Sequence, residues 1–395
     1  MKTALHHLIR EKSDAISHKV IAYREHMHMH PELSYQEFKT MEYVSSILTK
    51  LGIEHETGIG TTGIVGIIRA DHHTDEMKCI GLRADLDALP IHEENDIACK
   101  SQNDGIMHAC GHDVHTAILL GAAEIIHELR NELPAPVKLI FQPGEEKNPG
   151  GATLMLKDGV LENPGVSEMI ALHVFPDMEV GKVGFKAGIH MASCDEIHLT
   201  INGKGGHGAT PNQCIDPIMI GANIVTQLQQ IVSRKCDPKI PCVLSFGHFE
   251  AMGATNIIPS KAHLKGTFRT MNEDWRAEAL ELIEKQIKLI VESSGATVDL
   301  EISKGYPYLE NDPEVTGKLR SKSIAFLGQD LVEELPIRLT SEDFAYYSHE
   351  VPVCFFRLGV RNEAKGITFG VHHPRFNIDN EALKVGVQLM SLASF

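Results

Sequence analysis

The sequence predicts an α/β protein whose larger domain, with a mostly parallel sheet flanked by helices, is interrupted by a smaller α+β domain. Three observations support this fold class. The chain has 395 residues, which is more than one hydrophobic core usually holds. Short apolar strands alternate with amphipathic helices over the first 185 residues. Further along, over residues 186–302, the strands alternate polar and apolar residues, as in an antiparallel sheet with one exposed face.

The first part of the chain supplies helices and buried strands in turn. Apolar residues recur at helical spacing over residues 15–30, before Pro31, and over residues 36–52, which end at Gly52. A further helix is predicted over residues 115–130. Continuous apolar runs predict strands at residues 63–68, 79–84, 137–141 and 169–174. This alternation is typical of a sheet with helices on both faces.

The middle of the chain has the element order of a ferredoxin-like domain. Its predicted elements are, in sequence, a strand at 196–201, a helix at 216–233, strands at 243–250 and 262–270, a helix at 274–294 and a strand at 297–302. The α/β pattern then returns, with helices over 313–327 and 379–393. We therefore expect a discontinuous larger domain of residues 1–185 and 303–395, and an inserted ferredoxin-like domain of residues 186–302.

Composition excludes several classes of function. A formal net charge of -16 and a pI near 5.8 oppose binding to phosphate backbones, so we expect no nucleic-acid partner. The sequence lacks a run of the roughly 20 apolar residues that span a bilayer, and its N-terminus lacks the apolar core of a secretory signal. The eight cysteines include no Cys-x-x-Cys pair, which favours reduced thiols. We therefore expect a cytoplasmic protein with no membrane partner.

The run from Met107 to His115 concentrates metal-binding side chains. MHACGHDVH holds a thiol, three imidazoles and a carboxylate, and Cys110 and His112 flank a glycine just before a predicted helix. Both side chains can therefore turn toward one point. Two other interpretations remain open here, a structural zinc site and a cysteine nucleophile with a histidine base. The first lacks a second close-spaced Cys/His pair, and the second leaves neighbouring carboxylates unexplained.

A pair of adjacent glutamates, Glu145 and Glu146, follows a predicted strand in the turn QPGEE. Adjacent side chains in such a turn cannot face the same way. One of them can bind a metal ion while the other accepts a proton from water. Taken alone, the pair is more typical of a solvated acidic turn.

Further candidates lie at the ends of predicted strands. Asp85 and Asp87, in RADLDALP, would point to the same side if their strand continued, and carboxylates behind histidine ligands fix the orientation of the imidazoles. His173 closes another strand, and His372 lies in a C-terminal loop. Lone histidines in such places are more often structural than metal ligands.

Nine motifs, spread over most of the chain, carry a family resemblance. They are RADLDALP, MHACGHDVH, QPGEE followed by GGA, ALHVFP, GGHGATP with a following DP, NIIP, GTFRT, SEDFAYY and HHPRF. Together with REHMHMHPELSYQE near the N-terminus, they cover about residues 24–376. The chain resembles the dinuclear metallopeptidase family of aminoacylase and carboxypeptidase G type. Within that family it is most similar to the branch of hippurate hydrolases and plant auxin-conjugate amidohydrolases.

The resemblance implies two divalent metal ions per subunit (Zn, Mn, Co or Ni) at the carboxyl ends of the sheet strands. The implied ligands are Cys110, His112, Glu146, His173 and His372. Cys110 would bridge the two ions, and Glu145 would be the general base. Most of the wider family has His-x-Asp where this chain has Asp85-Leu86-Asp87, so His112 would supply the imidazole and Asp87 would assist catalysis from behind the ligands.

The reaction implied by the resemblance is the metal-dependent hydrolysis of N-acyl amino acids, such as acetyl or benzoyl derivatives, to a free amino acid and a carboxylic acid. The smaller domain would be a lid and dimerisation domain in a homodimer or higher homo-oligomer. His207, Asn256 and Arg269 would bind substrate there, although Arg269 also fits the pattern of a surface strand arginine.

Other functions remain as alternatives. Within the same enzyme class, these are a dipeptidase and an N-acetyl-diaminopimelate deacetylase. Outside it, they are a binding protein with an inactive site and a cysteine-dependent hydrolase with structural zinc.

Overall fold

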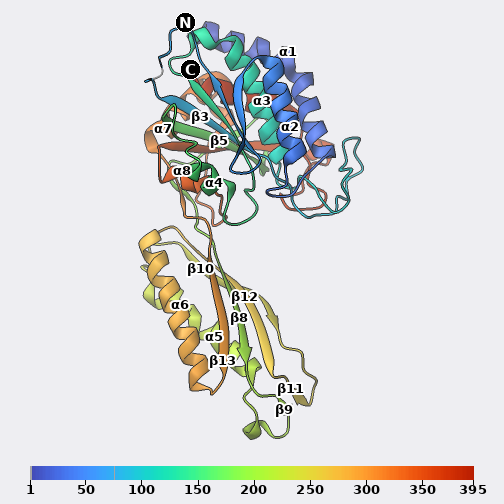
Figure 1. Ribbon diagram of the computed structural model, residues 1–395, viewed down its shortest axis with the longest axis vertical. Helices are drawn as coiled ribbons and strands as arrows, with labels where there is room; N and C mark the ends of the chain where they lie inside the picture. Colours follow the sequence, from blue (N-terminus) through green and yellow to red (C-terminus); the bar gives the residue numbers. More distant parts are fainter. Residues whose placement is uncertain (1, 75) are drawn as a thin grey trace. The chain divides into compact units, whose positions relative to one another are not determined.

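The computed structural model describes residues 2–74 and 76–395, which divide into two compact units. Unit 1 comprises the residues up to Gly188, Glu310–Pro336 and Tyr346–Phe395, and unit 2 comprises Ile189–Leu309 and Ile337–Ala345. Unit 2 thus interrupts unit 1 in the sequence (Figure 1). The short segment 337–345 falls in unit 2, whereas we expected it in the larger domain. Two backbone hydrogen bonds attach it to residues 190–192, a pairing that leaves no local sequence pattern.

An eight-stranded mixed sheet forms the centre of unit 1, in the order β1-β2-β4-β3-β5-β16-β6-β15. Its strands are β1 (Glu54–Ile59), β2 (Gly63–Ile68), β3 (Cys79–Asp85), β4 (Val137–Gln142), β5 (Val166–Glu179), β6 (Val183–Phe185), β15 (Val332–Glu334) and β16 (Val353–Arg361). The central strands β4, β3, β5 and β16 are parallel. Every residue of β3 and β4 is buried, as in parallel sheets covered on both faces.

Helices pack against this sheet (Figure 1). They are α1 (Lys2–Met29), α2 (Phe38–Leu51), α3 (His112–Glu128), α4 (Gly151–Lys157), α7 (Pro313–Leu327) and α9 (Glu381–Ala393), and a short α8 spans Ala345–Ser348. α1, α3 and α9 pack on one another, and α3 also contacts β3 and β5. The residues of α3 are buried from His112 to Ile126, so this helix is held firmly against the sheet. The predicted α/β fold with a mostly parallel sheet is confirmed.

Unit 2 is built on a four-stranded antiparallel sheet in the order β10-β12-β8-β13. Its elements are β8 (Asp195–Asn202), α5 (Pro217–Gln230) with a π-helical turn (Ile231–Lys235), β10 (Cys242–Glu250), β12 (Lys261–Thr270), α6 (Glu273–Ser293) and β13 (Thr297–Lys304). This order is ferredoxin-like, as expected. The remaining short strands are β7 (Gly188–Met191), β9 (Gly206–His207), β11 (Ile257–Ile258) and β14 (Leu309–Asn311).

Of the helices in residues 2–74 and 76–395, none combines the length and the apolar composition that crossing a bilayer requires.

Candidate metal centre

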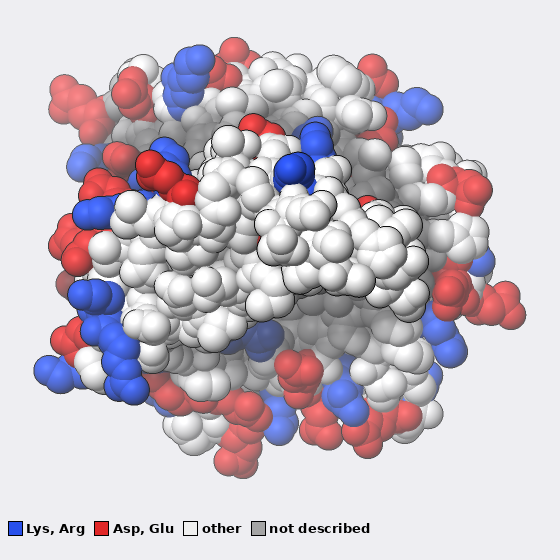
Figure 2. All heavy atoms as spheres, turned by 90° about the horizontal axis from the view of Figure 1, so that it is seen from below, with Lys and Arg blue, Asp and Glu red and all other residues white. Residues whose placement is uncertain are grey.

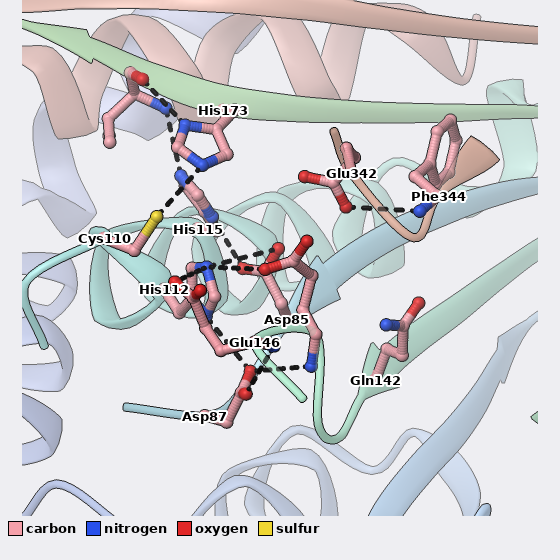
Figure 3. A network of polar contacts seen from close by, with 12 residues as sticks. Asp85, Asp87, Cys110, His112, His115, Gln142, Glu146, His173, Glu342 and Phe344 are labelled. Atoms are coloured by element: carbon pink, nitrogen blue, oxygen red, sulfur yellow. Dashed lines mark hydrogen bonds and ion pairs between the residues drawn. The ribbon is translucent and has the colours of Figure 1, made fainter. Parts of the chain in front are cut away.

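Metal-binding side chains converge at the carboxyl end of the parallel strands, where open α/β sheets place their sites (Figure 3). They come from segments far apart in the sequence. These segments are the end of β3, the start of α3, the turn after β4, the middle of β5 and the loop before α9. Because β3 is buried throughout and α3 nearly so, the side chains at the end of β3 and the start of α3 are carried by rigid elements.

The five predicted ligands lie in one cluster of unit 1. The ligand atoms of Cys110, His112 and His173 lie within 4.8 Å of one another, and so do those of Cys110, Glu146 and His372. Sγ of Cys110 lies 3.4 Å from Nε2 of His173. Nε2 of His372 lies 3.2 Å from Oε1 of Glu146. The two groups of ligand atoms share the Cys110 thiol.

Hydrogen bonds orient two of the imidazoles with Nε2 directed into the cluster. Nδ1 of His112 donates to Oδ1 of Asp87 at 3.1 Å, and Nδ1 of His173 donates to the carbonyl oxygen of Val174 at 2.7 Å. A histidine that binds a metal usually donates its second N–H in this way. Nε2 of His112 is buried and has no hydrogen-bond partner among the described residues. Three carboxylate oxygens lie 3.9 to 4.0 Å from it, so a divalent cation fits this arrangement.

The cluster has a strongly negative potential. Burial disfavours the imidazolium of His112, yet the carboxylates of Asp85 and Asp87 outweigh it and raise the pKa of His112 to about 10. Burial and the nearby Glu146 and Glu145 carboxylates raise the pKa of the Cys110 thiol well above its usual range. Both shifts mean that the site favours added positive charge and opposes added negative charge. A divalent cation held by these residues would supply that charge and would favour the thiolate of Cys110.

Asp87 lies behind His112 and holds the turn that carries the two glutamates. Its Oδ1 accepts hydrogen bonds from His112 and from the backbone N–H of Glu145, both at 3.1 Å. Its Oδ2 accepts from Oγ of Ser34 at 2.7 Å and from the backbone N–H of Glu146 at 3.0 Å. Although burial opposes ionisation, the hydrogen bond from His112 lowers the pKa of Asp87. Asp87 thereby fixes a candidate ligand and the candidate base together.

Asp85 serves different partners, because β3 ends at Asp85 and the strand does not continue to Asp87. Its Oδ1 accepts from Nδ1 of His115 at 2.6 Å, and its Oδ2 accepts from Arg83 at 2.5 Å. Nε2 of His115 in turn accepts from the backbone N–H of Val174 at 3.0 Å, so the neutral ring carries its proton on Nδ1.

Asp85 and His115 therefore link β3, α3 and β5 beside the ligands (Figure 3). Sequence reasoning gave His115 no role. Its position three residues after His112 on one helix face was the available signal.

Two of the three predicted substrate-binding residues come together in unit 2. His207 of β9 pairs with Ile257 of β11, next to Asn256. Both His207 and Asn256 are exposed. Nδ1 of His207 accepts from the backbone N–H of Ala209 at 3.0 Å, which leaves Nε2 as the donor nitrogen of the neutral ring.

Arg269, the third of these residues, lies in the other sheet of unit 2. It belongs to β12, and its Nη1 donates to the carbonyl oxygen of Leu339 at 3.0 Å. Leu339 is part of the 337–345 segment, which therefore orients the Arg269 side chain.

Comparison with known proteins identifies the family. The model of Peptidase family M20/M25/M40 matches residues 81–394. The chain belongs to this family. The N-acyl-L-amino acid amidohydrolase of Geobacillus stearothermophilus is 42% identical over 314 residues, which cover 78% of this chain and 83% of that protein. The expected family resemblance is confirmed, and this M20-family chain is a metal-dependent hydrolase.

Two solved structures share the fold of this M20-family chain over almost its full length. One, from methicillin-resistant Staphylococcus aureus, is 35% identical, with a TM-score of 0.86 and coverage of 98% of each chain. The other is the YXEP protein of Bacillus subtilis, described as a dinuclear metal-binding peptidase of the M20 family. It is 33% identical, with a TM-score of 0.78, and the match covers 96% of this chain and 98% of that one.

Proposed function

We propose that the protein hydrolyses the amide bond of N-acyl amino acids with the help of two divalent metal ions. The proposed ligands are Cys110, His112, Glu146, His173 and His372. The observation that carries the proposal is that two groups of candidate ligand atoms share the Cys110 thiol, and that Glu145 lies beside them. The G. stearothermophilus relative is named for N-acyl-L-amino acids, and the B. subtilis structure is described as dinuclear. Both descriptions support this assignment.

Two divalent cations held by this cluster would supply Lewis acidity, which polarises an amide carbonyl and lowers the pKa of water. Glu145 is the general base of the proposed reaction. Its carboxylate lies within one group of ligand atoms with His112 and Glu146, while Asp87 holds its backbone. Glu145 accepts a proton from the attacking water and returns it to the leaving nitrogen as the C–N bond breaks. The products are a carboxylate and a free amino acid.

Unit 2 supplies the proposed substrate contacts. Nε2 of His207 is suited to donate a hydrogen bond to the oxyanion that develops on the carbonyl, with Asn256 beside it. Arg269 uses one donor on Leu339, and its other N–H groups suit the carboxylate of the amino acid.

We assign the protein to a homodimer formed through unit 2. Figure 2 shows a broad surface with few charged side chains at the end of unit 2 that carries β9 and β11. Two exposed apolar residues of this region are Met252, 82% exposed, and Ile257, 55% exposed. Exposed apolar surface of this kind supports a protein interface. Light scattering on the protein as it elutes from a size-exclusion column measures the number of subunits.

We also assign the protein to the cytoplasm. All eight cysteines, which all lie in the described part of the chain, are free thiols. Unpaired thiols are usual in a reducing compartment.

Metal removal tests the proposal. The purified protein is dialysed against a chelator, then reloaded separately with Zn, Mn, Co or Ni ions. Each form is assayed for amino acid release from acetyl, benzoyl and indoleacetyl amino acids. Activity should vanish on chelation and return on reloading. Hydrolysis that survives chelation but is abolished by a thiol reagent would instead identify a cysteine-dependent enzyme. Faster cleavage of dipeptides or of N-acetyl-diaminopimelate would select those alternatives.

A further inference from the structure

Three consecutive backbone N–H groups of the turn after β4 are held by two buried carboxylates. Gly144 N–H donates to Oε1 of Glu37 at 2.8 Å, and the next two N–H groups donate to Asp87. Asp87 also contacts His112 and so belongs to the metal centre. Glu37 makes no hydrogen bond or ion pair with a proposed ligand in the described part of the chain. Its hydrogen bond to Gly144 therefore acts on the turn and not directly on a ligand side chain.

Glu37 directly precedes α2, and its side chain extends from there to the turn. Its side chain is buried, and its Oε2 accepts from Oγ1 of Thr62 at 2.6 Å. Nearby, the Tyr35 hydroxyl donates to the carbonyl oxygen of Lys147 at 2.7 Å and accepts from the N–H of Gly150 at 3.1 Å. Residues 34–37 thus form hydrogen bonds with the chain segment on both sides of Glu145.

The backbone at this contact is conformationally demanding. Gly144 has φ +57°, and a Cβ added there would lie 2.3 Å from the ring of Tyr35. Tyr35 itself has φ 66°, which is uncommon for a residue with a side chain. Such conformations persist at functional sites where the surroundings determine them. A glycine in a turn is also the most mobile kind of residue when nothing holds it.

We propose that Glu37 is a positioning residue, which holds Gly144 N–H so that the adjacent Glu145 keeps its orientation toward the reacting water. The inference rests on the proposed function, because it needs Glu145 as the base. Residues 143–146 lie outside helices and strands, so side-chain acceptors fix this turn. Misplacing a reacting group by about 1 Å costs on the order of 10²-fold in rate.

Three variants separate positioning from stability. Glu37→Met keeps the length of the side chain but removes the carboxylate acceptor. Glu37→Gln keeps an acceptor for Gly144 N–H and presents an amide N–H to Thr62, whose oxygen can accept it. Thr62→Val is the matched control, because it removes the other hydrogen bond of the same carboxylate and leaves the contact with Gly144 in place.

Each variant is measured for kcat, KM and bound metal on an N-acyl amino acid that the wild type hydrolyses. Amide hydrogen exchange of a peptide covering residues 142–150 gives a readout without turnover. Glu37→Met should lose about 10²-fold in kcat with unchanged KM and metal content. Its Gly144 amide should exchange at least about tenfold faster. Glu37→Gln should recover most of kcat, and Thr62→Val should keep the wild-type kcat and slow exchange.

Wild-type kcat and exchange in Glu37→Met would overturn the proposal, and so would an equal loss of kcat in Thr62→Val. Should Glu37→Met not fold, Glu37→Asp takes its place, since its shorter side chain withdraws the carboxylate from the turn. A metal-loaded wild type that hydrolyses none of the substrates would count against the proposed function. Hydrogen exchange would then still decide whether Glu37 holds the turn.

Discussion

Replacing Asp87 with asparagine should weaken the binding of divalent metal while leaving all five proposed ligands in place. Among the described residues, Asp87 contacts the metal centre through His112 and through the backbone of the turn that carries Glu145 and Glu146. The substitution changes one oxygen to an NH₂ group and removes a buried negative charge. Its effect on metal affinity therefore measures how much a carboxylate that is hydrogen-bonded to a ligand strengthens metal binding by that ligand.

The size of this effect follows from the four hydrogen bonds that the carboxylate accepts. In the less costly orientation, the NH₂ group of the asparagine replaces the oxygen that faces Ser34 and Glu146. The Ser34 hydroxyl can rotate and accept a hydrogen bond from this group, whereas the N–H of Glu146 loses its acceptor. His112 then donates to a neutral amide oxygen, so its Nε2 becomes a weaker ligand. Losing such an outer partner costs about 10–100-fold in metal affinity, or about 1.4–2.7 kcal/mol.

Competition with a chromogenic chelator measures the dissociation constants of both proteins. Ser34→Ala is the matched control, because it removes one donor to the same carboxylate and keeps both oxygens. Its metal affinity should stay close to that of the wild type. A wild-type affinity in Asp87→Asn would refute the reasoning that Asp87 tunes His112. An equal loss in Ser34→Ala would locate the effect in the surrounding packing.

Four further predictions address the proposed base Glu145, the Cys110 thiol, His207 and a buried carboxylate. Glu145→Gln should keep its metal but lose about 10²–10⁴-fold in kcat, as metal analysis and kinetics will show; a near-normal rate would exclude Glu145 as the base. Cys110→Ser should bind metal more weakly and prefer harder ions, and in the wild type Cys110 should react with thiol reagents only after chelation. His207→Ala should be folded and metallated yet about 10²–10³-fold slower, and mixing it with Glu145→Gln should restore some activity if His207 acts across a dimer. Burial and the charge of Asp87 raise the pKa of Glu37 from 4.5 to about 7, so wild-type stability should decline as the pH rises between these values. Glu37→Gln should lack this decline. In urea unfolding, its free energy of unfolding minus that of the wild type should therefore be up to about 3 kcal/mol larger at pH 8 than at pH 5, and parallel pH profiles of the two proteins would contradict this.

The sequence predicted those elements whose local pattern was strong. The strands at 63–68 and 137–141 and the helix at 313–327 were found within one residue of their predicted ends, because continuous apolar runs and a Pro after an Asp cap are local signals. The central strand β16 (Val353–Arg361) was missed. Its pairing with β5 is a long-range contact, and a lone apolar run does not reveal which strand it will join.

The same distinction between local and long-range signals applies to the metal centre. The motifs named the cluster-forming side chains, since residue type and order carry that information. They indicated Asp87 behind the ligands but gave no role to Glu37, which is 107 positions from its partner Gly144. Nor did they show that the Asp85 and Asp87 carboxylates take different partners, because this depends on where β3 ends.

The ending of β3 separates the roles of Asp85 and Asp87 in this chain. Although burial opposes ionisation, the charges of His112 and Arg83 lower the pKa of Asp85 well below its usual range. Asp85 is thereby committed to Arg83 and His115, whereas His112 presents the imidazole nitrogen to the cluster. Removing Asp85 would break its buried ion pair with Arg83, and the loss of one partner of a buried pair typically costs about 3–5 kcal/mol. Its loss would therefore act first on folding, whereas the loss of Glu145, the proposed base, would act first on proton transfer.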